Sequence, residues 1–594
     1  ILKDAAAASI WGVRAANGVI VITTKSGQNQ EKPTLDVSYF LTIDSKADYK
    51  DMHLISPSDA VDVQLELIQK GWWTPTEVDQ YHSSVNKVQE AYYNAMKRLE
   101  TGNYSLIATD PQFWSEIEEL RNANLYKQFE KELLRRAVQN RLNISFRGGS
   151  EKSNYYLSAV YDHQALGSVG DKSDDLILNL KHDYKIANRL TFSTGINVQY
   201  KNEENNGISI GRLADETPFH NLWDAEGNRI QYYMVDPWEG KNREEMGYLP
   251  YTTNMLNEQE TNDYTTNTFS ARLQAALKWN IIRGLDVETR FQYERAYTDI
   301  EDLRSKNSPY MRRLINDNTL VNADGQLINN LPVGAMHKET KNELEAWTWR
   351  SQLTYNGDWN DSKHMLTAVL GHEMRMYRTI GRSALQYGYD PDALTYVAID
   401  ETAWENREYD TWYGLPSLLD NGKQHEFTEI DNRDLSVFLN AAYTFAGKYS
   451  VSASGRMDRT NLFGNDSDYN YNFIWSSGLS WRISEEAFAK TDWMDRLMVR
   501  LTYGIGGNVN KNFFPMLMGS KGVSKGVPYI HLINPANKDL TWEKTTTINA
   551  GIDFSFLNNR LSGNIDFYVA NTSDLLMKRT VPIMNGYNSI MDNV

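Results

Sequence analysis

One alternating stretch decides the fold: Leu435-Ser436-Val437-Phe438-Leu439-Asn440-Ala441-Ala442-Tyr443-Thr444-Phe445. Leu, Val, Leu, Ala, Tyr and Phe occupy its odd positions, and mostly small or polar residues lie between them. Because successive side chains of a strand point to opposite faces, a period of two predicts a β-strand with one apolar face.

The same alternation returns along most of the chain. It is clear in Ile548-Asn549-Ala550-Gly551-Ile552 and again from Leu561 to Val569. Counting all such stretches, we predict about fifteen strands. The remaining stretches lie near 33–44, 141–149, 153–163, 175–187, 189–201, 264–280, 284–298, 343–357, 363–378, 448–460, 471–483 and 496–506.

The connections between these strands alternate in length. Short, turn-forming connections such as Ala446-Gly447-Lys448 and Leu557-Asn558-Asn559-Arg560 are separated by long connectors near 203–262, 299–341, 379–425 and 507–541. Two connections break the pattern: 484–495 is long and helix-like where a short turn is expected, and 164–174 is brief. Short turns on one side and long loops on the other are typical of an antiparallel transmembrane β-barrel of the outer membrane. We therefore predict an all-β fold of this kind.

Composition narrows the function classes. The 594 residues carry a net charge of −16, which disfavours a nucleic-acid partner, and include no cysteine, which excludes disulfides and Cys-ligated zinc. No apolar run approaches the ~20 residues that a spanning helix needs, but a barrel strand crosses a membrane in roughly 9–11 residues. Gly371-His372-Glu373 lacks the second histidine of a zinc-protease helix. We expect no enzyme activity and no catalytic, cofactor-binding or metal-binding residue.

Residues 45–138 differ from the rest. Ser56-Pro57-Ser58-Asp59 predicts a helix start, and Ala60–Lys70 and Trp114–Ala137 are amphipathic at helical spacing. In the alternation of short and long connections this segment falls on the external side. We predict a large, partly helical external loop.

Tryptophans gather in the predicted external loops. Flat rings can stack on sugars or hold peptide side chains, although packing within the loops is the commoner role of such residues. The candidate substrate contacts are Trp72, Trp73, Trp223, Trp238, Trp404 and Trp412.

The opening stretch carries a resemblance to a family. Ile1-Leu2-Lys3-Asp4-Ala5-Ala6-Ala7-Ala8-Ser9-Ile10-Trp11-Gly12-Val13-Arg14-Ala15-Ala16-Asn17-Gly18-Val19-Ile20-Val21-Ile22-Thr23-Thr24-Lys25-Ser26-Gly27 resembles the end of the plug domain in SusC/RagA-type TonB-dependent transporters, with Trp11 where that family usually has Tyr. Later stretches resemble the same family in the same order: Gly148-Gly149-Ser150, Phe463-Gly464, Ser480-Trp481-Arg482, Arg500-Leu501-Thr502-Tyr503-Gly504 and Leu540-Thr541-Trp542-Glu543-Lys544.

The resemblance implies a barrel of about 22 strands in the full protein, filled by a plug. On this basis we expect a fragment, with 1–27 as the end of the plug domain and 28–594 as a barrel that is incomplete at its C-terminus. The family implies TonB-dependent import of a bulky nutrient, an oligosaccharide or a peptide, across the Gram-negative outer membrane. It also implies several partners: a SusD-like surface lipoprotein, the TonB-ExbB-ExbD complex acting through a segment before Ile1, outer-membrane lipid, and a second transporter–lipoprotein pair.

Other functions fit parts of the pattern. A siderophore or vitamin receptor shares the barrel and plug but needs no lipoprotein lid. A secreted β-rich adhesin or glycan-binding protein would share the alternation without a closed barrel. A glycan-processing enzyme would need a pair of carboxylates in a cleft.

Overall fold

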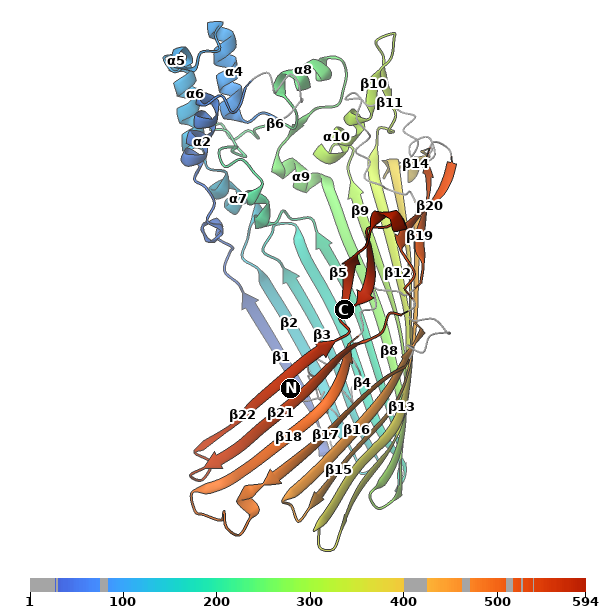
Figure 1. The fold of residues 1–594 in the computed structure, drawn as a ribbon. Coiled ribbons are helices and arrows are strands. Elements are labelled where there is room, and N and C mark those ends of the chain that lie inside the picture. Colours follow the sequence, from blue (N-terminus) through green and yellow to red (C-terminus); the bar gives the residue numbers. More distant parts are fainter. Residues whose placement is uncertain are drawn as a thin grey trace.

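One antiparallel sheet dominates the computed structural model, which describes residues 27, 30–74, 84–399, 425–461, 471–508, 516–524, 527–537 and 539–594 (Figure 1). Within these residues sixteen strands share the sheet, and all but the short β14 (Thr395–Val397) follow one another in chain order. The fifteen strands on this path match the predicted number. They are β1 (Gln30–Ile43), β2 (Val138–Gly149), β3 (Ser153–Ala165), β4 (Asp171–Ala187), β5 (Leu190–Asn205), β8 (Asn262–Ile282), β9 (Leu285–Arg304), β12 (Ala335–Trp359), β13 (His364–Asp390), β15 (His425–Phe445), β16 (Tyr449–Thr460), β17 (Tyr471–Arg482), β18 (Met494–Asn508), β21 (Glu543–Phe556) and β22 (Leu561–Ser573).

The outer face of the sheet exposes apolar side chains, which a water-soluble protein would bury. Along β15, Val437 and Leu439 are 43% and 51% exposed, whereas Ser436 and Phe438 on the opposite face are 5% and 2% exposed. The pairing of each strand with its neighbour continues this apolar outer face around the curved wall in Figure 1. An exposed apolar face beside a polar inner face suits lipid outside and a polar interior. This confirms the predicted membrane-barrel strands.

Tight turns join the strands at the lower end in Figure 1. Ala446 and Gly447 take left-handed backbone angles (φ 53° and 68°), as do Leu557, Asn558 and Asn559. Gly284 (φ 84°) cannot carry a side chain, because a Cβ there would lie 2.2 Å from the carbonyl oxygen of Asn356. In the irregular connection after β17, the predicted helix-like stretch forms only the 3-10 turn η6 (Ile483–Glu485).

Several strands are longer than the alternation predicts. β13 continues to Asp390 and β12 begins at Ala335, so these strands extend well past the expected ends at 378 and 343. Most residues of the extensions are polar, but Met336, Leu385 and Tyr387 are buried in a cluster with residues of the β9–β12 connection rather than exposed to lipid. The regular alternation that lipid imposes therefore does not mark these segments in the sequence.

A helical body connects β1 to β2, as predicted for this loop. Ser56 begins its first long helix: the hydroxyl oxygen of Ser56 accepts the backbone N–H of Asp59 at 3.1 Å. The core of this body includes Val61, Val88 and Phe113. Its elements are η2 (Tyr49–Met52), α2 (Pro57–Gln69), α4 (Lys87–Leu99), α5 (Tyr104–Ile107), α6 (Pro111–Asn122) and α7 (Leu125–Leu133).

The stretch predicted as one helix over 114–137 is two helices. Ala123 is extended (ψ 152°), and the side-chain oxygen of Asn124 then accepts the N–H of Lys127 to begin α7. Asn is a favourable helix cap, so the break is encoded locally.

Two further connections carry short elements. β5–β8 contains η3 (Ile210–Ala214), β6 (Tyr232–Tyr233), α8 (Pro237–Glu245), β7 (Thr252–Thr253) and α9 (Met255–Thr261), and β9–β12 contains α10 (Pro309–Asp317), β10 (Thr319–Val321) and β11 (Leu327–Asn329). Toward the C-terminus lie β19 (Met518–Ser524), β20 (Val527–Asn534), β23 (Leu576–Thr580), η7 (Ile583–Asn585) and β24 (Ser589–Asn593). Across the described residues, no helix has the length and apolar character needed to cross a membrane.

The predicted plug remnant falls almost wholly outside the described residues, which begin with Gly27 and resume at Gln30. The division into 1–27 and 28–594 therefore stays a prediction.

Candidate functional site

The candidate site is the set of loops opposite the tight turns, seen at the top of Figure 1. Trp72 lies there, 69% exposed as a residue, with the ammonium of Lys70 5.0 Å from its ring centroid. Trp73 packs instead against the core of the helical body, with its ring 6.3 Å from that of Tyr92. Of these two neighbours, only Trp72 presents a free ring face to a ligand.

Trp223 and Trp238 join loops together. The ring of Trp238 on α8 lies 4.0 Å from that of Tyr93 on α4. Trp223 packs against the cluster formed around Phe129, with the guanidinium of Arg229 5.5 Å from its ring. Both contacts are internal to the loops. A substrate role for these residues stays a prediction, and Trp404 and Trp412 lie outside the described residues.

The β5–β8 loop is attached to the helical body by backbone contacts. The N–H of Leu125 donates to the carbonyl of Pro218 at 3.1 Å. The side-chain oxygen of Gln128 accepts the N–H groups of both Leu222 (2.6 Å) and Trp223 (3.1 Å). All three contacts end on main-chain groups of the β5–β8 loop, so they fix its position relative to the helical body.

His220 lies within this junction, largely covered by its neighbours. Its ring stacks on Tyr232 at 4.2 Å with an interplanar angle of 14°. Burial, assisted by the charge of Lys87, lowers the pKa of His220 to about 3. Burial likewise raises the pKa of Tyr232, whose hydroxyl donates to the carbonyl of Asn221 at 2.7 Å. Both groups are neutral at physiological pH and act as packing residues.

The β9–β12 loop is attached in turn to the β5–β8 loop. The amide of Asn316 accepts the N–H of Leu249 at 3.0 Å and donates to the carbonyl of Leu249 at 2.8 Å. The guanidinium of Arg312 donates to the carbonyls of Pro250 and Thr252. Met311 and Ile315 on α10 pack against Leu385 on β13. The helical body and the two loops thus form one continuous structure on the barrel rim, which we call the loop assembly.

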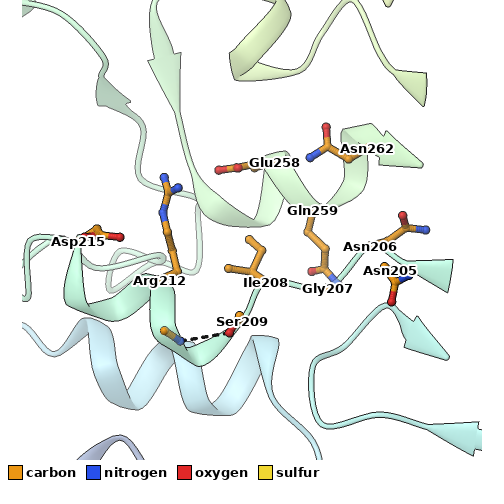
Figure 2. A pocket seen from close by; sticks show the side chains of 11 residues that line it. Asn205, Asn206, Gly207, Ile208, Ser209, Arg212, Asp215, Glu258, Gln259 and Asn262 are labelled. Carbon is orange, nitrogen blue, oxygen red and sulfur yellow. Dashed lines mark hydrogen bonds between the residues drawn. The ribbon is translucent and has the colours of Figure 1, made fainter. Parts of the chain in front are cut away.

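A polar cavity of about 440 Å³ opens beneath α9, where β5 ends and β8 begins (Figure 2). Three acidic or amide side chains reach it from α9 and the start of β8, and the other lining residues come from the end of β5, from the 206–209 connection, from η3 and from the residue after η3. We call it the rim pocket. Its lining is Asn205, Asn206, Gly207, Ile208, Ser209, Gly211, Arg212, Asp215, Glu258, Gln259 and Asn262.

The rim pocket lies on the inner side of the wall. In β5 the exposed apolar residues Phe192, Ile196 and Tyr200 occupy even positions, so Asn205 falls on the opposite, inner face. In β8 the exposed apolar residues occupy odd positions, from Phe269 to Leu277, which places Asn262 on the inner face too. The pocket therefore faces the mouth of the barrel.

The pocket wall is held by hydrogen bonds from behind. The side-chain oxygen of Asn206 accepts the N–H of Tyr264 at 2.6 Å, and the side-chain nitrogen of Gln259 donates to the carbonyl of Val169 at 2.7 Å. The N–H of Gly207 donates to the carboxylate of Asp171 at 2.6 Å. A Cβ at Gly207 would lie 2.6 Å from the Cβ of Ser168, so the close approach requires glycine.

The charge of the pocket is negative. The guanidinium of Arg212 is engaged by Glu216 at 2.7 Å, a bond that raises the pKa of Arg212. The carboxylates of Asp215 and Glu258 make no side-chain hydrogen bond within the described part of the chain. The arrangement offers carboxylate acceptors and amide groups that both donate and accept, which suits the binding of a polar ligand.

This pocket was not predicted from the sequence, because only aromatic side chains were considered as candidate substrate contacts. The available signal was a pair of polar stretches, Asn205-Asn206-Gly207 at the end of β5 and Glu258-Gln259 in α9 just before β8, whose amide and carboxylate groups can bond to a ligand. Among the described residues, no group of three or more His, Cys, Asp or Glu side chains is placed to hold a metal ion.

Comparisons with known proteins agree with this geometry. Residues 209–594 match the family model described as TonB dependent receptor-like, beta-barrel. TonB-dependent receptor P39 of Formosa agariphila is 24% identical over 605 residues, which cover all of this chain and 48% of the relative. TonB-dependent receptor SusC of Bacteroides thetaiotaomicron is 25% identical over 626 residues, covering all of this chain and 52% of SusC. The chain thus spans about half the length of the curated relatives it matches.

A solved structure shares the fold. The RagAB peptide importer in its 'closed-closed' state superposes with a TM-score of 0.71 at 21% identity, covering 100% of this chain and 60% of that chain. The sheet order, the inverted exposure of its two faces, the family match and these relatives all agree. The chain therefore belongs to the TonB-dependent receptor β-barrel family, as a SusC/RagA-type protein of the outer membrane.

Proposed function

We propose that the protein to which this chain belongs imports a bulky nutrient, an oligosaccharide or a peptide, across the outer membrane. One observation carries the proposal: a packed loop assembly stands over a barrel wall whose inner face is polar. A fixed external surface above a polar interior suits capture of a large hydrophilic molecule before its passage. The comparisons also support import, because one sequence relative is the TonB-dependent receptor SusC and one similar solved structure is named a peptide importer.

We further propose that import depends on partners. The TonB-ExbB-ExbD complex supplies the energy, and a SusD-like lipoprotein covers the loop assembly as a lid. The transporter–lipoprotein pairs associate as dimers, surrounded by outer-membrane lipid. The protein binds and moves its substrate without cleaving it. Among the described tryptophans Trp72 is the most exposed, and we propose that it touches the substrate or the lid.

Growth tests the proposal. We expect deletion of this gene alone to abolish growth on one class of nutrient supplied as the sole source, with restoration by the full-length gene. Extraction in a gentle detergent is expected to recover a lipoprotein with the transporter. Growth of the deletion strain on every oligosaccharide and peptide tested, or recovery of the full-length protein from the soluble periplasm, would contradict the proposal.

A further inference from the structure

We propose that the rim pocket binds one neutral, hydroxyl-rich sugar unit of the imported substrate. The inference rests on the proposed import function and narrows it to glycans. It starts from the pocket's position on the inner side of the barrel mouth, where a substrate held by the loops would meet Asn205 and Asn262 (Figure 2).

The anchored amides leave complementary groups for a ligand. Asn206 uses its oxygen for Tyr264, which leaves its NH2 group as a donor. Gln259 uses its nitrogen for Val169, which leaves its oxygen as an acceptor. Since each side chain is fixed at one end, neither loses much freedom when its other end binds, and the site is organised before a ligand arrives.

Hydroxyl groups match this set better than other groups do. A hydroxyl both donates and accepts, so the several hydroxyls of one sugar can serve the amide of Asn206 and the carboxylate of Glu258 alike. An ammonium or guanidinium only donates and would leave the amide donors without partners. Ile208 is the one large apolar side chain of the lining, so an apolar peptide side chain would gain little there.

The charges disfavour acidic ligands. Asp215 and Glu258 contribute two negative charges, and the guanidinium of Arg212 is bonded through its Nε to Glu216. A uronic acid or a sulfated sugar brought into this cavity would face repulsion from both carboxylates, offset by a single guanidinium that already interacts with acidic neighbours. A neutral sugar is therefore the chemistry that the rim pocket fits.

Binding by the full-length protein in detergent tests the inference. The probes for isothermal titration calorimetry are maltohexaose, cellohexaose and mannohexaose as neutral glycans, oligogalacturonate as an acidic glycan and hexalysine as a cationic peptide. The variants are Asn205→Leu, Glu258→Leu and Glu258→Gln. The control is Glu245→Leu, which changes an exposed glutamate of α8 outside the pocket. Heat-modifiable migration on a gel verifies that each variant is folded.

We expect at least one neutral glycan to bind. Each Leu variant should weaken that binding about tenfold, the effect of losing a hydrogen bond to a charged or amide group. Glu258→Gln should weaken it by less than about threefold, because the amide still bonds to hydroxyls. The control should match the wild type.

Three outcomes would overturn the inference. Neutral-glycan affinity that is unchanged in both Leu variants would place the sugar elsewhere. Binding of hexalysine that disappears in Glu258→Gln would make the pocket a cation site. Binding of only peptides or only acidic glycans would exclude the neutral sugar. In all three cases nutrient-dependent growth still tests import separately, so a failed pocket and a failed transporter give different results.

Discussion

At the scale of single residues, the protonation of His220 makes the stability of the loop assembly depend on pH. Its pKa of about 3 in the folded protein lies below the ordinary value of 6.5, so the unfolded loop binds a proton first as the pH falls. The part of the folding stability that depends on neutral His220 is complete above about pH 6.5. Between pH 6.5 and about pH 3 it falls by about 1.4 kcal/mol per pH unit.

We predict that His220→Phe removes this loss, because the phenyl ring keeps the stacking on Tyr232 but takes no proton. The readout is hydrogen–deuterium exchange of peptides from 213–234 at pH values from 7 to 4. His425→Phe, at an exposed histidine, is the control and should retain the acid sensitivity. Equal acid sensitivity in His220→Phe and wild type would assign the effect to another group.

Gly284 gives a second prediction at this scale. Gly284→Ala forces a side chain into a left-handed conformation and against the carbonyl of Asn356, so we expect a loss of more than about 2 kcal/mol in the free energy of unfolding. Gly447→Ala has the same backbone strain (φ 68°) with open space around the Cβ, and should lose only about 1 kcal/mol. Urea unfolding of the full-length protein in lipid vesicles measures both. Equal losses would show that the contact with Asn356 costs nothing.

At the scale of elements, the lipid-facing side of β15 can be tested directly. Leu439→Arg places a charge on the exposed apolar face and should destabilise the barrel by about 2–4 kcal/mol if that position lies near the membrane centre. Thr367→Arg, at an exposed position on the inner face of the neighbouring β13, should cost far less. The fraction that migrates as folded protein on an unheated gel reports the difference. Similar effects at both positions would contradict the assignment of the two faces.

The elements were predictable to different degrees. Each strand with an apolar and a polar face, such as β15, was visible because lipid outside and a polar interior enforce the alternation. The rim extensions of β12 and β13 were not predicted because loop residues rather than lipid cover their few apolar side chains, such as Leu385, so no regular alternation is imposed. The helix of α2 was signalled by Ser56, but the break at Asn124 was hidden by apolar spacing that runs through both helices. The rim pocket brings together α9 and the end of β5, about fifty residues apart in the chain, and no local pattern records that proximity.

At the scale of the whole molecule, Asn316 tests whether the loops move together. Asn316→Ala removes both hydrogen bonds to Leu249 and leaves two partly buried backbone groups unpaired, so we expect the contact between the two loops to weaken by about 1–3 kcal/mol. Faster hydrogen–deuterium exchange over 244–253, in a different loop from the mutation, would record it. Asn307→Ala, an exposed change in the same loop as Asn316, is the control. Exchange that quickens only around residue 316 would mean that the loops open independently.

The attachment of one loop to the next also limits how the substrate preference of this protein can change during evolution. Exchange of the β5–β8 loop alone would bring new residues against Gln128 on one side and Asn316 on the other, and each mismatch would leave buried backbone groups unsatisfied. Recombination that moves the loop assembly as one block avoids both penalties. Related proteins that prefer different nutrients should therefore differ in the helical body and both loops together. The strands beneath these loops should diverge separately.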